Sequence, residues 1–261
     1  MGEAPENTLV SFQKAVEQGA GFVEFDVRGT KDGEVVIIHD ATLERTASGR
    51  GRVKHRGLKD LKALDAGYRF TPDGGRSFPC RGQSIEIPTL AEFLTAFRET
   101  RAIVEIKQAR PSIVRRVIEI VRDLHSEDRV LLATERDEIM REIRGQIHEQ
   151  HLTIATGFSY GEVAAFMTWL GEGRTRSYQP LGQAFQIPPV YQGMALVNRQ
   201  TVAAAHELGI EMLVWTVNDI EEMKRLLELG VDGIITDYPA RLRELLFKSF
   251  KPQRSIDRGR K

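Results

Sequence analysis

The sequence predicts an α/β protein built as a (β/α)8 barrel, and three observations lead to that prediction. Apolar segments rich in β-branched residues alternate with amphipathic helical segments, which is the pattern of parallel β/α units. Eight helical segments accompany seven strands, a count that favours a closed barrel over a doubly wound sheet. The strand that is unaccounted for should precede the first helix, where the chain begins. We therefore expect the first strand to be missing: residues upstream of Met1 are absent, or another segment closes the barrel, since seven strands would leave two edges unpaired.

The helical segments carry recognisable start signals. The first helix begins near Leu9, with Asn7 or Thr8 as its N-cap. Thr89 and Glu92 have the spacing of a capping box at the start of a second helix. That helix is expected at about 89–100, and the others at about 112–126, 136–149, 161–171, 198–209, 219–230 and 240–249.

The strands are short runs between these helices. A further run at 34–40 follows the turn sequence KDG closely enough to return on the first strand as a hairpin. The expected parallel strands lie at 22–27, 102–107, 130–134, 152–158, 181–187, 211–217 and 231–237.

Composition restricts the function more than it defines it. The 261 residues include 37 basic and 37 acidic side chains, so the zero net charge gives no support for nucleic-acid or anionic-membrane binding as the main role. The single cysteine, Cys80, rules out an intrachain disulfide and favours a reducing compartment. No apolar run approaches the roughly 20 residues that span a bilayer. We therefore expect a cytoplasmic protein without an integral membrane segment.

We expect one barrel domain over residues 1–250, with one insertion and one tail. The turn-rich stretch at about 41–88 follows a strand end, where barrel enzymes place insertions that form part of the active site. A surface loop without a special role is the alternative. The basic residues 251–261 predict a mobile, solvated tail rather than a contact for an acidic partner.

Two carboxylates suggest a metal site. Glu24 and Asp26 occupy alternate positions of an apolar strand, so both point to one face. Neighbouring carboxylates in a water-poor site need a cation to stay ionised, and hard oxygen ligands suit Mg²⁺ or Ca²⁺. The alternative is that they are solvated at the strand end or paired with Arg28.

Glu105 and Lys107 repeat this alternation in a second strand. Glu105 could complete a three-carboxylate site, and Lys107 could hold an anionic oxygen of the substrate. A buried ion pair between Glu105 and Lys107 explains the same pattern equally well.

Other polar residues follow predicted strands. His39 ends the hairpin arm, where it can exchange protons near neutral pH and where Asp40 could orient it. Trp215 and Asn218 come at the end of a late strand, and Trp215 is a pocket wall or a core residue with about equal weight. Asp237 also follows a strand, and we interpret it as a helix N-cap.

With these residues identified, the chain resembles the glycerophosphodiester phosphodiesterase family. The segment PENTLVSFQKAVEQGAGFVEFDVRGTKDGEVVIIHDATLERTASGRG resembles the central signature of that family almost continuously. EIK at 105–107, VWTVN at 214–218 and GVDGIITDYP at 230–239 resemble its later blocks in the same order. The resemblance extends to about residue 245.

The resemblance implies a TIM barrel of the PLC-like phosphodiesterase type that hydrolyses glycerophosphodiesters to an alcohol and glycerol 3-phosphate with one divalent cation. It also implies roles for individual residues. Glu24, Asp26 and Glu105 look like metal ligands, His39 like one of two acid/base histidines, Lys107 like a phosphate contact and Trp215 like a pocket aromatic.

The chain departs from the family pattern at its start. Family members have a first strand ending in His-Arg-Gly before the PENT block, whereas Met1 begins just after that position. The tripeptide His55-Arg56-Gly57 lies in the insertion and is a poor substitute for it.

Two functional hypotheses follow from this departure. The first is an active, metal-dependent phosphodiesterase acting by acid/base catalysis on a small glycerophosphodiester. The second is an amino-terminally incomplete or degenerate barrel that binds metal and phosphodiester with little or no turnover. Within the enzyme class, related barrels cleave lysophospholipids or sphingomyelin-type substrates. A membrane-facing apolar loop would favour these substrates, and the sequence shows none beyond scattered residues such as Phe70 and Phe78.

Overall fold

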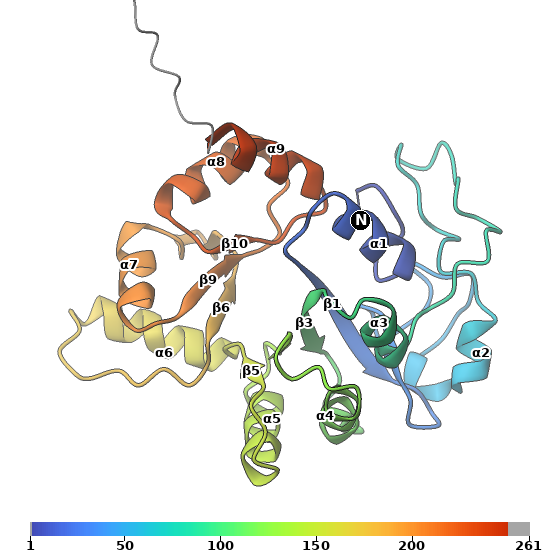
Figure 1. Ribbon diagram of the computed structural model, residues 1–261, viewed down its shortest axis with the longest axis horizontal. Helices are drawn as coiled ribbons and strands as arrows, with labels where there is room; N and C mark the ends of the chain where they lie inside the picture. Colours follow the sequence, from blue (N-terminus) through green and yellow to red (C-terminus); the bar gives the residue numbers. More distant parts are fainter. Residues whose placement is uncertain (1, 250–261) are drawn as a thin grey trace, which may run out of the picture.

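The structure is a computed structural model that describes residues 2–249, and its strands form a ring enclosed by helices (Figure 1). Neighbouring strands in the ring run parallel, and only β2 pairs antiparallel with β1 as the expected hairpin arm. The five-stranded sheet has the order β2 (Val35–Ile37), β1 (Phe22–Gly29), β3 (Arg101–Ile106), β4 (Val130–Ala133), β5 (Ala155–Thr156). The three-stranded sheet has the order β10 (Gly233–Ile234), β9 (Glu211–Val214), β6 (Ala184–Ile187).

Two neighbouring strand pairs in the described residues lack a hydrogen-bonded ladder. Between β5 and β6, the backbone N–H of Gln183 donates to the carbonyl of Thr156 at 2.8 Å. Gly182 permits this close approach, because a Cβ atom there would lie 2.4 Å from the carbonyl oxygen of Gly157. Between β1 and β10 the two sheets enclose a cavity. The expectation that a further strand belongs at this side of the barrel stays a prediction.

The helices cover the outside of the ring and divide the core. Phe25 and Phe93 are fully buried between the five-stranded sheet and its helices, and Phe166 and Phe185 occupy the same place on the three-stranded sheet. A small inner cluster around Ile103 lies inside the barrel and joins residues of both sheets. The helices are α1 (Leu9–Glu17), α3 (Leu90–Ala96), α4 (Val114–Asp123), α5 (Asp137–Glu149), α6 (Tyr160–Gly171), α7 (Arg199–Glu207), α8 (Ile220–Leu229) and α9 (Pro239–Ser249).

Helix starts agree with the sequence signals. The Thr8 side chain accepts a hydrogen bond from the backbone N–H of Ser11, so Thr8 and not Asn7 is the N-cap of α1. Thr89 and Glu92 form the predicted capping box of α3, although that helix ends at Ala96, earlier than expected.

Several expected strands are shorter than predicted, two of them reduced to two residues each, and one hairpin was not expected. The run 152–158 contains only β5, and the run 231–237 contains only β10. In the latter, the backbone N–H of Asp237 donates to the side chain of Asn218 instead of a strand. The unexpected hairpin joins β7 (Val190–Tyr191) to β8 (Met194–Ala195) through Gln192 and Gly193, both at positive φ.

The insertion at 41–88 has its own small core. It contains the 3-10 helix η1 (Val53–His55) and α2 (Leu58–Lys62), and its buried residues include Leu43, Val53 and Leu61. The predicted tail at 251–261 lies outside the described residues. In the part of the chain that the structure describes, no helix is both long and apolar enough to cross a membrane.

Candidate active site

Three carboxylates converge at the ends of β1 and β3. Asp26 lies in register with Glu105 of the parallel neighbour strand, and Glu24 shares their face because side chains alternate along β1. One carboxylate oxygen from each residue lies within 4.8 Å of the other two. The structure thus brings together the three residues that the sequence pattern singled out.

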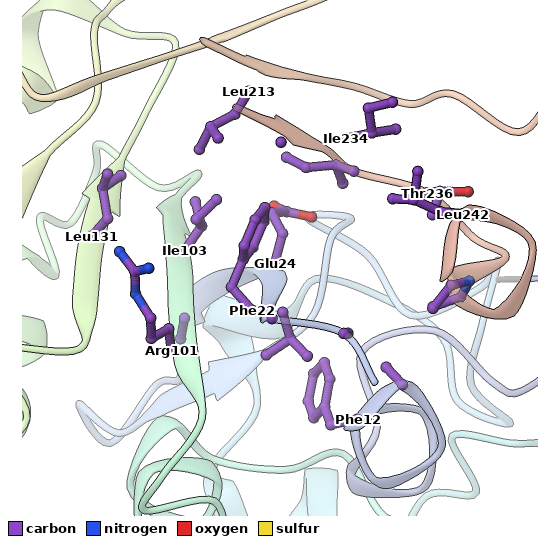
Figure 2. A pocket seen from close by; sticks show the side chains of 18 of the residues that line it. Phe12, Phe22, Glu24, Arg101, Ile103, Leu131, Leu213, Ile234, Thr236 and Leu242 are labelled. Carbon is purple, nitrogen blue, oxygen red and sulfur yellow. The ribbon is translucent and has the colours of Figure 1, made fainter. Parts of the chain in front are cut away.

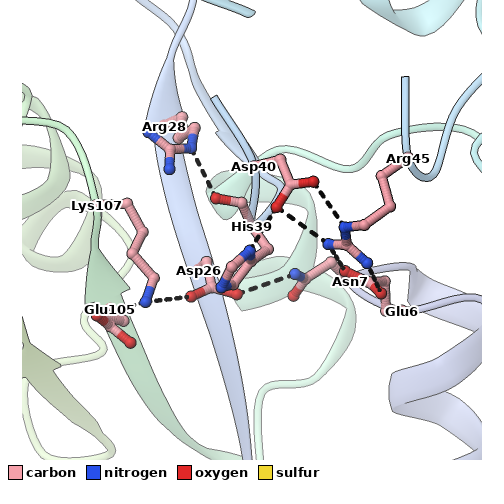
Figure 3. A network of polar contacts seen from close by, with 9 residues as sticks. All are labelled: Glu6, Asn7, Asp26, Arg28, His39, Asp40, Arg45, Glu105 and Lys107. Carbon is pink, nitrogen blue, oxygen red and sulfur yellow. Dashed lines mark hydrogen bonds and ion pairs between the residues drawn. The ribbon is translucent and has the colours of Figure 1, made fainter. Parts of the chain in front are cut away.

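Lys107 lies directly on this cluster. Its Nζ is 2.7 Å from Oε1 of Glu105 and 3.3 Å from Oδ1 of Asp26, while the Asn7 side chain donates to Oδ2 of Asp26 at 3.1 Å (Figure 3). The Glu105–Lys107 ion pair and the carboxylate cluster are therefore both present, although the sequence analysis treated them as alternative explanations of the same pattern.

The electrostatics of the cluster favour a bound cation. Three ionised carboxylates and one ammonium leave a net charge of −2. Burial raises the pKa of Glu24 well above its usual value, and the charges of Asp26 and Glu105 raise it further. Burial also raises the pKa of Glu105, against the effect of Lys107. An oxygen-only donor set with excess negative charge fits a hard divalent cation, so the residues present suit the metal that the family resemblance implies.

A chain of polar contacts orients His39. Its Nδ1 lies 2.7 Å from Oδ1 of Asp40, and Arg45 bridges Asp40 to Glu6 with two contacts of 2.6 Å (Figure 3). Hydrogen bonding from Arg45, and then from His39, lowers the pKa of Asp40 and keeps it ionised. Arg28 donates to the backbone carbonyl of His39 at 2.8 Å, and no direct ion pair joins it to the carboxylates among the described residues, as the alternative interpretation would require.

Asn218 joins the ends of β9 and β10. Its Nδ2 donates to Oδ2 of Asp237 at 2.7 Å, and its Oδ1 accepts from the hydroxyl of Thr236 at 3.0 Å. The interpretation of Asp237 as an N-cap was wrong, because α9 begins two residues later and Asp237 accepts from Asn218.

A cavity of about 1170 Å³ borders several of these groups. Glu24, Asp26, His39 and Asp237 line one part of it, and the rest continues between β1 and β10 along walls that carry both apolar and charged side chains, Arg101 among the latter (Figure 2). The labelled residues of those walls include Phe12, Phe22, Ile103, Leu213 and Leu242.

Two residues considered in the sequence lie apart from this site. Trp215 is half-buried one residue after β9 and is not among the residues that line the cavity, so its role as a pocket aromatic stays a prediction. His55 is exposed in the insertion and does not line the cavity either.

Sequence reasoning missed the partners of the site residues. Asn7 was considered only as a helix cap, yet its side chain contacts Asp26. Glu6 and Arg45 are 39 residues apart in the chain and meet only in the folded structure. The polar residues Glu6 and Asn7 just before the first helix were a signal that Asn7 could contact the site. No feature of the sequence indicated the contact between Glu6 and Arg45.

Comparison with known proteins places these observations in a family. The family model described as "Glycerophosphoryl diester phosphodiesterase family" matches residues 1–241. The chain is 34% identical over 249 residues to a glycerophosphodiester phosphodiesterase of Caldanaerobacter subterraneus subsp. tengcongensis, covering 94% of this chain and 93% of the relative. It is 27% identical over 270 residues to a lysophospholipase D of Mus musculus, covering 94% of this chain and 83% of the relative.

The chain is also similar to solved structures of phosphodiesterases. The phosphodiesterase of Oleispira antarctica, in complex with the product sn-glycerol-3-phosphate, is 25% identical with a TM-score of 0.74 over 94% of this chain and 93% of that one. The likeness to such neighbours confirms the predicted TIM-barrel-like fold class.

Proposed function

The chain belongs to the glycerophosphoryl diester phosphodiesterase family, and on this premise we propose that it hydrolyses glycerophosphodiesters to an alcohol and glycerol 3-phosphate with the help of one divalent cation. The observation that carries the proposal is a three-carboxylate cluster, two members of which, Glu24 and Asp26, line the same cavity as the oriented His39. A phosphoryl group placed there would meet carboxylates able to hold a cation, an ammonium group and one acid/base histidine.

Glu24, Asp26 and Glu105 would hold Mg²⁺ or Ca²⁺, which supplies neutralisation of the charge on the phosphoryl oxygens. Lys107, already between two of these carboxylates, positions an anionic oxygen of the substrate.

His39 serves as one acid/base group. Because Asp40 engages Nδ1, Nε2 remains to exchange a proton with the nucleophile or with the leaving alcohol oxygen. The ionised Asp40 stabilises the imidazolium that forms when His39 accepts a proton, and Arg45 holds Asp40 in place.

One observation supports a second candidate substrate, a lysophospholipid. Tyr160 at the start of α6 and Met194 in β8, 58% and 60% exposed, belong to an apolar surface on the segments that follow β5 and β6. Tyr160 contacts Tyr191 of the same surface with ring centroids 5.8 Å apart. These loops lie on the face of the barrel that carries the carboxylate cluster, where an acyl chain would cover the exposed rings. The similarity to a lysophospholipase D is consistent with this candidate.

The decisive assay is release of choline from glycerophosphocholine and from lysophosphatidylcholine, with glycerol 3-phosphate as the second product of the former and lysophosphatidic acid as the second product of the latter. Activity is expected with Mg²⁺ or Ca²⁺ and should be lost with EDTA. His39→Asn should lower kcat by about 10²–10⁴-fold, whereas His55→Asn, at an exposed histidine outside the cavity, should leave kcat unchanged. Equal activity of the His39 variant and the parent chain would contradict the role of His39. Metal binding without release of product from either substrate would support the degenerate barrel instead.

A further inference from the structure

A second, smaller cavity of about 250 Å³ lies beside the carboxylate cluster. It is formed where β1, β3 and β4 end, together with part of the insertion, so it opens on the functional side of the barrel. Its lining contains no acidic side chain, and its residues are Arg28, Ala41, Arg52, Lys54, Lys107, Gln108, Ala109, Arg110 and Arg136.

Four of the six cations in this lining make no direct ion pair with a carboxylate, although Arg28 feels the charges of Asp26, Asp40 and Glu105. Lys107 pairs with Glu105 and Asp26, and Arg136 pairs with Glu138 at 2.7 Å. Among residues 2–249, Arg28, Arg52, Lys54 and Arg110 make no ion pair with an acidic side chain. In a chain whose net charge is zero, such a local excess of positive charge in a concave site attracts anions.

The cavity is connected to the proposed reaction centre through Lys107. This residue lines the small cavity while its Nζ contacts the cluster (Figure 3). Its volume is below the range of about 300–1,000 Å³ typical of whole-ligand pockets, so it suits one substituent of a substrate rather than the entire molecule. A phosphodiester bound at the cluster can therefore place an additional group in this cavity.

We propose that this basic cavity binds an anionic substituent, of the phosphate monoester type, on the alcohol portion of the substrate. The proposal rests on the proposed function and narrows its substrate class to glycerophosphodiesters whose alcohol carries a further phosphate. Guanidinium groups recognise phosphate oxygens in a bidentate manner, and three arginines lie in the lining without an acidic partner. The insertion at 41–88 supplies Arg52 and Lys54, and so acquires a role in substrate selection.

The test compares hydrolysis of glycerophosphoinositol 4-phosphate and glycerophosphoinositol, which differ only in the additional phosphate. We expect kcat/KM to be about tenfold or more higher for the phosphorylated substrate at low ionic strength, and this preference to shrink with added salt. Arg52→Gln and Arg110→Gln should each lower kcat/KM for the phosphorylated substrate about tenfold, because each removes a charge-assisted hydrogen bond. Both should leave kcat/KM for glycerophosphoinositol unchanged.

Arg115→Gln is the matched control, since Arg115 is exposed on α4 and carries the same charge outside the cavity. A binding measurement needs no turnover: inositol 4-phosphate, titrated by calorimetry in EDTA, should bind the parent chain more tightly than inositol and lose that advantage in the Arg52 variant. Equal kcat/KM for both substrates, or equal binding of both inositols, would overturn the proposal while leaving the proposed function intact. Hydrolysis of neither substrate, with inositol 4-phosphate still bound preferentially, would count against the proposed function alone.

Discussion

Glu24→Gln should make the metal-free chain more stable and the metal-loaded chain less so. The carboxylate oxygens of Glu24, Asp26 and Glu105 lie within 4.8 Å of one another, so each pair of charges repels by roughly 3 kcal/mol at an effective dielectric constant of about 20. Lys107 offsets part of this repulsion. Removing the charge of Glu24 should therefore increase the free energy of unfolding by about 1–3 kcal/mol at pH 8 in EDTA.

The pH dependence gives the sign of the effect. The pKa of Glu24 is raised in the folded chain, first by burial and then by the neighbouring carboxylates. Its contribution to stability is thus complete below the unfolded value of about 4.3 and is lost as pH rises through the raised folded pKa. The advantage of Glu24→Gln in EDTA should therefore grow between pH 5 and pH 8.

Urea unfolding at several pH values measures this difference, with Glu99→Gln as the control because Glu99 is exposed in a turn. Adding Mg²⁺ or Ca²⁺ at a hundred times its Kd should stabilise the parent chain by about 2.7 kcal/mol and the variant by much less. An equal or lower stability of Glu24→Gln in EDTA at pH 8 would refute the reasoning, as would an undiminished metal response.

Three other substitutions test separate parts of the structure. Lys107→Met should tighten metal binding, because a positive charge beside the cation is removed, and should lower kcat/KM about tenfold, because the substrate loses a cationic contact. Metal titration and steady-state kinetics measure the two effects. Weaker metal binding together with lower kcat/KM, or tighter binding together with higher kcat/KM, would contradict this. Asp40→Asn should lower kcat about tenfold with little change in KM, by weakening the support of His39. Gly182→Ala should cost about 1–3 kcal/mol in urea unfolding, because its Cβ would meet the backbone. The control Gly145→Ala, exposed within α5, should gain about 0.5–1 kcal/mol.

The metal-binding candidates were predictable because strand geometry is regular. Alternation along β1 fixes the common face of Glu24 and Asp26, and the in-phase register of parallel strands then brings Glu105 beside them. Irregular segments follow no such period. The shortening of β10 depends on the side chain of Asn218 taking backbone donors, and the cation-lined cavity depends on where the insertion places Arg52. Neither position can be deduced from the spacing of residues in the sequence.

The separation of the hydrophobic core into two outer clusters has a consequence for how the site can move. All three carboxylates lie on β1 and β3, which pack against the hydrophobic cluster formed by residues between 12 and 154. Asn218 and Asp237 follow β9 and β10, which pack against the second cluster, formed by residues between 158 and 234. The two parts meet where β5 and β6 lack a ladder and where β1 and β10 do not pair within residues 2–249. A hinge-like displacement of one half-barrel against the other would therefore change the width of the mouth while the geometry of the three carboxylates stays fixed. If a cation binds at the three carboxylates, such a displacement would leave its ligands in place while the opening beside Asp237 changes.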